Sequence, residues 1–303
     1  MSKIQKALEK IQGAKTKSRQ GRDERPSIDD SIVVARLVDR GKKEATYDVS
    51  DICLHVDEEA LRDAGLIAPE YHEQLLANQY RDIKRPLSAH AFGKRVTQIE
   101  GGNLIMVSSA LPGEGKTFTS INLALSMAHE KDHFVLLVDA DVAKPHSSEM
   151  FGAADELGLL DVLEKPDIPV QSLILPTDVD NLSLLPAGKP RPHSTELLAS
   201  AVMENVCETL ARLSAGQIVI FDSPPLLQTS EAKVLADLAG QVVIVVRAEE
   251  TSQDAVMGAL AVLDQGKAVN LVLNQARAGV GEYQYGYGYG YGKKEVENNG
   301  NEE

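Results

Sequence analysis

Short apolar runs alternate with helical stretches from Gly102 onward. Each run is four or five residues long and almost free of polar residues, which is typical of strands buried on both faces. The runs are Leu104–Val107, Phe134–Val138, Leu182–Leu185, Ile218–Phe221, Val242–Val246 and Val269–Leu273. The helical candidates are Lys116–His129, Ser194–Leu213, Ser230–Ala239 and Ser252–Gln265. Helical crossovers between buried strands predict an α/β fold with a mostly parallel sheet flanked by helices.

The residues before this region predict a helical N-terminal extension. Residues 1–12 carry apolar side chains at helical spacing, and residues 13–30 are polar and predict a linker. Helical signals return between Asp57 and Arg85, with breaks predicted at Pro69 and Pro86 because proline lacks the N–H that a helix interior uses. We therefore divide the chain into three parts, which are residues 1–95, residues 96–280 and a tail over residues 281–303.

The tail differs from the rest of the chain in composition. Its segment Tyr283–Gly292 reads YQYGYGYGYG and holds five of the eight tyrosines of the protein. Such low complexity offers no pattern for a packed core, so the sequence predicts a flexible, tyrosine-rich tail.

Composition excludes several classes of protein. No apolar run approaches the roughly 20 residues of a membrane-spanning helix, and no secretory signal opens the chain, so we expect a cytoplasmic location. Cys53 and Cys207 are far apart without metal-ligand spacing, and we expect two buried thiols. The net charge of −14 argues against nucleic-acid binding, which needs a basic surface. Residues 1–25 hold 8 basic and 3 acidic residues. This charge is compatible with binding to an acidic membrane surface or partner, and also with a solvated helix and linker.

The segment SSALPGEGKT, residues 108–117, predicts a phosphate-binding loop because it follows a strand and opens a helix. Glycines turn backbone N–H groups toward phosphate oxygens, and the helix N-terminus adds partial positive charge. Ala110 stands where the strict pattern has glycine, while Gly113 and Gly115 supply the tight turn. The expected nucleotide contacts are Pro112, Gly113, Glu114, Gly115, Lys116, Thr117 and Phe118.

Carboxylates follow two other predicted strands. Asp139 and Asp141 come after the second strand, and Asp222 follows the strand at residues 218–221. Because ligands of open parallel sheets bind at the carboxyl ends of the strands, we expect these groups to converge on the loop. Mg²⁺ prefers carboxylates, hydroxyls, waters and substrate phosphates. The predicted magnesium ligands are Thr117, Asp139 and Asp222, and the predicted catalytic residues are Lys116, Asp139, Asp141 and Asp222.

Together, the loop, the Asp-Ala-Asp segment, the Asp-Ser-Pro-Pro segment and the tail resemble the bacterial tyrosine kinases of polysaccharide biosynthesis, over about residues 95–292. The segments AGLIAP, residues 64–69, and YRDIKRPL, residues 80–87, resemble the stand-alone autokinases of exosortase-linked exopolysaccharide systems. The resemblance implies phosphoryl transfer from ATP, with Mg²⁺, to tail tyrosines. Asp139 is the expected base and Asp141 positions metal or substrate, or these roles are exchanged. The expected acceptors are Tyr283, Tyr285, Tyr287, Tyr289 and Tyr291.

The resemblance also implies partners. Subunits would form a homo-oligomer with the tail in a neighbour's site, and a membrane protein that controls polysaccharide chain length would activate the kinase. The location would be cytoplasmic and peripheral at the inner membrane through that partner. The family's oligomerisation motif Glu-x-x-Arg-x-x-Arg is altered, since its positions read Asn78, Arg81 and Lys84 here.

Two alternatives stay open from the sequence. Partitioning and cell-division ATPases resemble this chain in fold, but their signature lysine is replaced by Leu111 and they lack a tyrosine tail. A nucleotide-binding scaffold without transfer activity is the second alternative.

Overall fold

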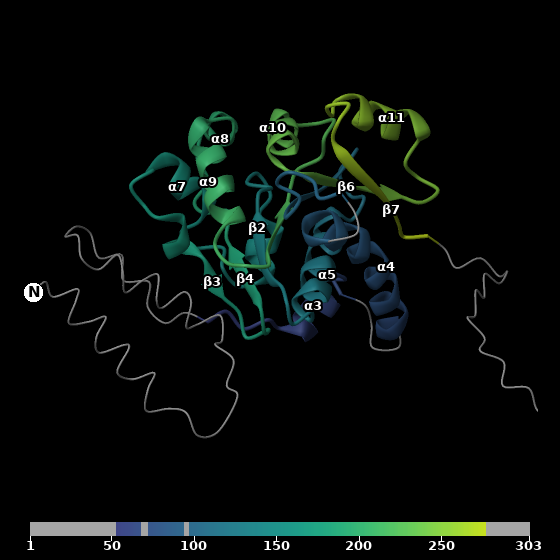
Figure 1. Ribbon diagram of the computed structural model, residues 1–303, viewed down its shortest axis with the longest axis horizontal. Helices are drawn as coiled ribbons and strands as arrows, with labels where there is room; N and C mark the ends of the chain where they lie inside the picture. Colours follow the sequence, from purple (N-terminus) through teal and green to yellow (C-terminus); the bar gives the residue numbers. More distant parts are fainter. Residues whose placement is uncertain (1–52, 68–71, 94–96, 277–303) are drawn as a thin grey trace, which may run out of the picture.

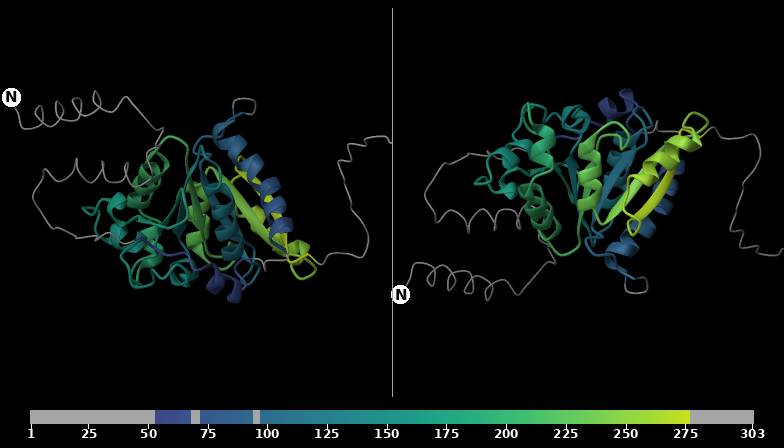
Figure 2. Two further views of the ribbon diagram at one scale, coloured as in Figure 1. Left: turned by 90° about the horizontal axis from the view of Figure 1, so that it is seen from below. Right: turned by 90° about the horizontal axis from the view of Figure 1, so that it is seen from above.

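A seven-stranded sheet forms the middle of three layers in the computed structural model, which describes residues 53–67, 72–93 and 97–276 (Figures 1 and 2). The strand order is β3-β4-β2-β5-β1-β6-β7, and all neighbours are parallel except β3 and β4. The strands are β1 (Leu104–Ser109), β2 (Phe134–Asp139), β3 (Leu175–Pro176), β4 (Leu182–Leu185), β5 (Gln217–Asp222), β6 (Gln241–Arg247) and β7 (Ala268–Asn274). Each of the six predicted apolar runs lies within a strand, so the predicted mostly parallel sheet is confirmed.

One face of the sheet is covered by helices from the N-terminal half of the described chain. These are α3 (Glu58–Asp63), α4 (Glu73–Phe92), α5 (Lys116–Ala128) and the short α6 (His146–Met150). Leu61 of α3 and Leu87 of α4 share a core with Ile105 of β1 and Ile121 of α5. The helices that precede the phosphate loop therefore pack into the same core as the sheet.

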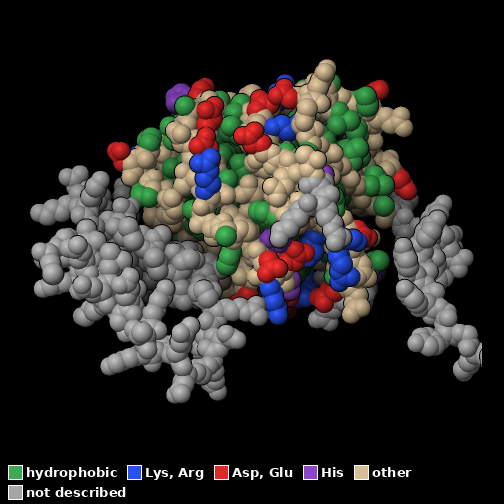
Figure 3. Space-filling view, viewed as in Figure 1, with side chains coloured by type: hydrophobic (Ala, Val, Ile, Leu, Met, Phe, Trp, Pro, Cys, Tyr) green, Lys and Arg blue, Asp and Glu red, His purple; other side chains and the backbone are tan. Residues whose placement is uncertain are grey.

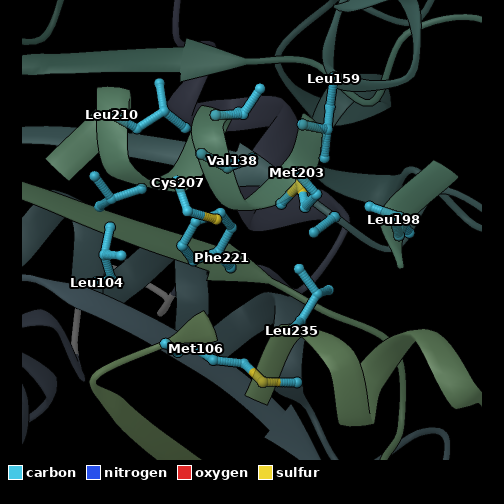
Figure 4. Packing of buried hydrophobic residues seen from close by; sticks show 14 of the residues in the cluster. Leu104, Met106, Val138, Leu159, Leu198, Met203, Cys207, Leu210, Phe221 and Leu235 are labelled. Carbon is cyan, nitrogen blue, oxygen red and sulfur yellow. The ribbon is translucent and has the colours of Figure 1, made fainter. Parts of the chain in front are cut away.

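Later helices cover the opposite face. They are α7 (Leu159–Glu164), the 3₁₀ turn η2 (Val170–Leu173), α8 (Ser194–Leu198), α9 (Ala201–Ala211), α10 (Ser230–Leu238) and α11 (Gln253–Ala261). Figure 4 shows the resulting core, in which Met203 and Cys207 of α9 lie beside Phe221 of β5 and Val138 of β2. The sheet is thus sealed from water on both faces at its centre, as the apolar runs require.

Helix α4 corrects the predicted break at Pro86, because it continues through this residue to Phe92. Packing on both sides of the proline explains the continuity. Lys84 donates to the Ser126 carbonyl oxygen at 2.6 Å and pairs with Glu130 at 2.9 Å, and Leu87 is fully buried. Pro86 itself lies on the exposed face, so water can bond the backbone carbonyl that loses its helical partner.

Two further predictions about elements were wrong. The single helix expected over residues 194–213 is divided, because Ser200 has extended backbone angles and begins α9 as its N-cap. The run at residues 269–273 is a strand but is not buried on both faces, since Leu271 and Leu273 of β7 are 56% and 64% exposed. β7 is the last strand of the sheet and has a neighbour on one side only, which leaves these leucines uncovered.

The cysteine prediction was correct for Cys207, which is buried, and wrong for Cys53, which is exposed. Cys53 precedes Leu54, whose backbone pairs with the outer edge of the sheet through Pro176 and Asp178. This segment lies along the rim of the sheet, where only alternate side chains reach the core.

Among residues 53–67, 72–93 and 97–276, no helix is both long enough and apolar enough to cross a membrane. On the face seen in Figure 3, Lys and Arg side chains are interspersed with Asp and Glu. The predicted helix at residues 1–12, the linker at residues 13–30, the break at Pro69 and the tyrosine tail lie outside the described residues.

Candidate active site at the phosphate loop

The loop between β1 and α5 has the backbone geometry of an anion site. Gly113 and Gly115 have φ values of 79° and 94°, a region that glycine enters without strain. Gly115 is also the N-cap of α5 and offers no side chain to bond the free N–H groups of the first turn. These N–H groups remain available to phosphate oxygens, and the 13-residue helix adds its positive end.

The buried side chain of Glu114 stabilises the loop through hydrogen bonds. The side chain accepts a hydrogen bond from the Leu111 backbone N–H at 2.7 Å and another from the Thr251 hydroxyl. Asn274, at the end of β7, donates to the Glu114 carbonyl oxygen at 2.9 Å. The Glu114 side chain therefore fixes the loop and does not face a ligand, so its expected nucleotide contact is limited to its backbone.

The side chain of Lys116 forms an ion pair with the carboxylate of Asp141. Its Nζ lies 2.9 Å from Oδ2 of Asp141, and both side chains are largely buried. The pairing places the cation at the mouth of the loop and neutralises one of the three predicted carboxylates.

Asp222 and Asp139 lie side by side because β5 and β2 are neighbours with these residues in register. Asp222 accepts hydrogen bonds from Ser120 at 3.1 Å and from Ser147 at 2.8 Å, and the Thr117 side chain also bonds it. Burial raises the pKa of Asp222, an effect that Lys116 partly opposes. The sequence prediction that β1, β2 and β5 bring their polar ends together is therefore confirmed in space.

Asp139 is the most enclosed of the three carboxylates. Its Oδ2 accepts hydrogen bonds from the backbone N–H and the hydroxyl of Ser148, both at 2.7 Å, while its Oδ1 has no partner. Burial, and then the charge of Asp222, raise the pKa of Asp139 to about 8. A carboxyl group with this pKa holds a proton at neutral pH unless a cation approaches it.

The predicted ligands are not equally well placed to coordinate a metal ion. Within the described residues, no group of three or more His, Cys, Asp or Glu side chains is arranged to hold a metal. Thr117 and Asp222 are bonded to each other at the base of the loop, which suits one hydroxyl and one carboxylate beside a phosphate-bound Mg²⁺. Asp139 is fully enclosed and bonded to Ser148, so direct coordination by it would require these contacts to open.

A cavity of about 420 Å³ opens beside the loop. Of the predicted nucleotide contacts, all but Glu114 line it. The three aspartates lie behind the lining and do not contact the cavity directly. Further lining residues come from three other parts of the chain and are Gly65, Leu66, Lys144, His146, Asn274 and Gln275.

From the sequence, Asn274 was a possible adenine contact, with a cap or surface role favoured, and the other additional lining residues were not assigned to the site. Asn274 was visible as a polar residue at a strand end, and Lys144 as a cation just beyond the Asp-Ala-Asp segment. Gly65 and Leu66 gave no such signal, because only the folded chain brings them to the loop. The five predicted acceptor tyrosines lie outside the described residues.

The fold and this site define a P-loop nucleotide-binding protein of the α/β class, and residues 102–276 match the AAA domain family. The chain is 30% identical over 190 residues to tyrosine-protein kinase YwqD of Bacillus subtilis, covering 63% of this chain and 76% of that one. It is 32% identical over 166 residues to tyrosine-protein kinase wzc of Salmonella typhimurium, covering 54% of this chain and 22% of that longer protein. The chain belongs to the family of bacterial tyrosine-protein kinases.

Solved structures agree with this membership. The kinase domain of VpsO is 26% identical with a TM-score of 0.57, and the match covers 69% of this chain and all of that one. The kinase domain of Escherichia coli tyrosine kinase ETK is 26% identical with a TM-score of 0.54, covering 70% of this chain and 80% of that one. A P-loop kinase domain implies the use of ATP.

Proposed function

We propose that this protein is an ATP-dependent protein-tyrosine autokinase that phosphorylates its own C-terminal tyrosine cluster. The observation that carries the proposal is the arrangement at one edge of the sheet. Lys116 on the phosphate loop pairs with Asp141, and Asp139 and Asp222 lie directly behind them. Family membership supports the reaction class, and the tyrosine cluster supplies an acceptor on the same chain.

Phosphoryl transfer depends mainly on positioning and on stabilising charge. Backbone N–H groups of the loop would hold the phosphates, and Lys116 would neutralise charge on the terminal ones. Mg²⁺, when bound with ATP, supplies further charge neutralisation, and Thr117 and Asp222 would hold it directly or through water.

A tyrosine hydroxyl with a pKa near 10 needs a base as it attacks. Between the two candidates, accessibility favours Asp141 over Asp139. Lys116 lines the cavity and pairs with Asp141, so movement of Lys116 to the phosphates would free the Asp141 carboxylate. Asp139 is fully enclosed and would position Asp141 and the metal. Asp141→Asn would then slow transfer more than Asp139→Asn, and the reverse order would exchange their roles.

The tail residues Tyr283, Tyr285, Tyr287, Tyr289 and Tyr291 are the proposed acceptors. Glycines between them leave each phenol accessible and allow the backbone to enter a narrow site. We propose that each tail enters the site of a neighbouring subunit. Each phosphate adds a charge of about −1.5 to −2, so a fully modified tail would repel a domain that is already acidic and would loosen the assembly.

The biological setting in the proposal is exopolysaccharide synthesis or export, with the exosortase-linked systems as the specific case. A membrane protein that controls chain length would recruit and activate the kinase at the inner membrane. The basic residues 1–25 would favour contact with such an acidic surface. Loss of recruitment when these residues are deleted would support this role, and unchanged recruitment would exclude it.

Intact-mass measurement after incubation with ATP and Mg²⁺ tests the proposed reaction. We expect additions of phosphate in the wild type and none in Lys116→Met or in a chain whose five tail tyrosines are replaced by phenylalanine. If no phosphate is added, even with the cytoplasmic segment of a candidate membrane partner, the autokinase proposal is wrong. ATP hydrolysis alone would then indicate a regulatory ATPase, and nucleotide binding alone would indicate a scaffold.

A further inference from the structure

The loop that follows α3 reaches the active site from the N-terminal segment. Leu66 and Gly65 line the cavity together with Phe118, the residue after Thr117 at the start of α5. A single amide fixes this arrangement, because Nδ2 of Asn122 donates to the Leu66 carbonyl oxygen at 2.6 Å and to the Phe118 carbonyl oxygen at 2.7 Å. Leu66 therefore has a defined place beside the phosphate loop.

Helix geometry separates this wall from the face of α5 that contacts α4. Phe118 and Asn122 are four residues apart and share one face of α5. Thr119 lies on a different face and bonds Tyr80 of α4, the helix that docks on β6 through Gln241. Leu66 and Phe118 therefore lie at a face of α5 that is about 100° around the helix from the face that contacts α4.

The residues that line the cavity differ in chemistry. At the end of β7, Asn274 and Gln275 present amide groups, which suit hydrogen bonding to the edge of a nucleotide base. Lys144, which follows β2, comes from the opposite side of β1, and Leu66 and Phe118 supply the apolar part of the lining. Asp139 and Asp141 are also at the end of β2, and Lys116, which pairs with Asp141, lines the same cavity as Leu66 and Phe118.

We propose that Leu66 and Phe118 form the wall of the subsite that holds the acceptor tyrosine ring, so that the segment before the kinase domain contributes to substrate binding. This inference rests on the proposed function. A phenol presents an apolar ring and one polar hydroxyl. Packed against Leu66 and Phe118, the ring would direct its hydroxyl toward Lys116 and Asp141. The alternation of tyrosine with glycine in the tail leaves room for one ring at a time beside the wall.

The segment that carries Leu66 is anchored along its length. Leu54 donates to the Pro176 carbonyl oxygen at 2.8 Å, and the Val56 N–H donates to Asp178 at 2.9 Å, at the outer edge of the sheet. Leu61 of α3 is buried in the core. Substitution of Leu66 therefore changes the cavity wall without releasing the segment that supports it.

Steady-state kinetics with a separate acceptor test the inference. The enzyme is the full chain with its five tail tyrosines replaced by phenylalanine, and the acceptor is a synthetic peptide of residues 281–292. Leu66→Ala removes apolar surface from a half-buried side chain, so we expect the KM for the peptide to rise roughly fivefold to tenfold while the KM for ATP stays unchanged. Phe118→Ala should also raise the KM for the peptide, but Phe118 is an expected nucleotide contact as well, so an unchanged KM for ATP is expected only of Leu66→Ala.

Ile67→Ala is the matched control, because Ile67 packs against the same core but does not line the cavity. We expect its peptide KM to equal that of the parent enzyme, and thermal unfolding will show whether the variants are folded to the same extent. A raised KM for ATP with an unchanged peptide KM would overturn the inference and assign the wall to the nucleotide. Equal effects of Leu66→Ala and Ile67→Ala on the peptide KM would overturn it as well. If neither the parent enzyme nor the wild-type chain transfers phosphate when the cytoplasmic segment of a candidate membrane partner is present, the proposed function fails and the inference fails with it.

Discussion

Replacing Asp139 by asparagine should stabilise the nucleotide-free protein at alkaline pH while leaving it unchanged in acid. Asp139 is fully buried, and only one of its two carboxylate oxygens has hydrogen-bond partners. An asparagine side-chain oxygen can accept the same two hydrogen bonds from Ser148. The substitution therefore preserves the local bonds and removes a group that ionises at high pH.

The magnitude follows from the difference in pKa between the folded and unfolded chain. The ordinary pKa is 3.8 and burial raises it to about 8, so between these values the folded state holds a proton that the unfolded state has lost. In that window the free energy of unfolding falls by up to about 1.4 kcal/mol per pH unit. The stabilising proton is fully retained in acid and is lost as the pH rises through 8. Since Asp222 also resists ionisation and shares the cost, we expect Asp139→Asn to gain about 2–3 kcal/mol at pH 8 relative to pH 5.

Urea unfolding at pH 5 and pH 8, with EDTA and without nucleotide, measures the effect. Asp161→Asn is the control, because Asp161 is buried and paired with Arg191 at 2.9 Å. Its substitution should destabilise the protein at both pH values, since it removes one partner of a buried pair. If Asp139→Asn destabilises the protein equally at pH 5 and pH 8, Asp139 is a charged structural anchor and the reasoning is refuted.

Three further predictions concern the loop and the thiols. Thr251→Val leaves the buried Glu114 carboxylate without its hydroxyl partner, so we expect a loss of about 1–3 kcal/mol in unfolding free energy, which Thr251→Ser should avoid. Gly115→Ala should abolish ATP binding measured by calorimetry, because the Cβ of the new alanine would lie 2.0 Å from an asparagine side chain of β7. Retained binding would show that the loop can shift. Burial raises the pKa of the Cys207 thiol to about 12, whereas Cys53 is exposed. A thiol reagent should therefore react with Cys53 in the native protein and with both cysteines after denaturation. Rapid reaction of Cys207 in the native protein would contradict the packing.

The parts of the fold that depend on local pattern could be predicted from the sequence. An apolar run indicates that a segment is buried, and the loop motif indicates a particular backbone conformation. Six strands and the phosphate loop could therefore be predicted from the sequence. Strand order is different, because it depends on partners that no single run identifies. The exposed leucines of β7 follow from its place at the sheet edge, and their sequence is indistinguishable from that of a central strand.

Contacts between distant segments explain most of what the sequence did not predict. Leu66 reaches the cavity because of a hydrogen bond from Asn122, a residue 56 positions later. Pro86 stays within a helix because Lys84 and Leu87 are held by α5 and the sheet. The convergence of the three aspartates beside the loop was predicted, but their unequal enclosure depends on Ser147 and Ser148, whose positions in α6 carried no signal of their own.

The position of β5 between β1 and β2 has a consequence for synthesis on the ribosome. The strand that carries the phosphate loop and the strand that carries Asp139 are not neighbours, and β5 must insert between them. β5 is made about a hundred residues after β1, which at 5–20 residues per second is roughly 5–20 s later. Until then the nascent chain holds the phosphate loop and Asp139 without the strand that joins them. The arrangement of the loop beside all three carboxylates should therefore form late and abruptly during translation, after Asp222 has emerged.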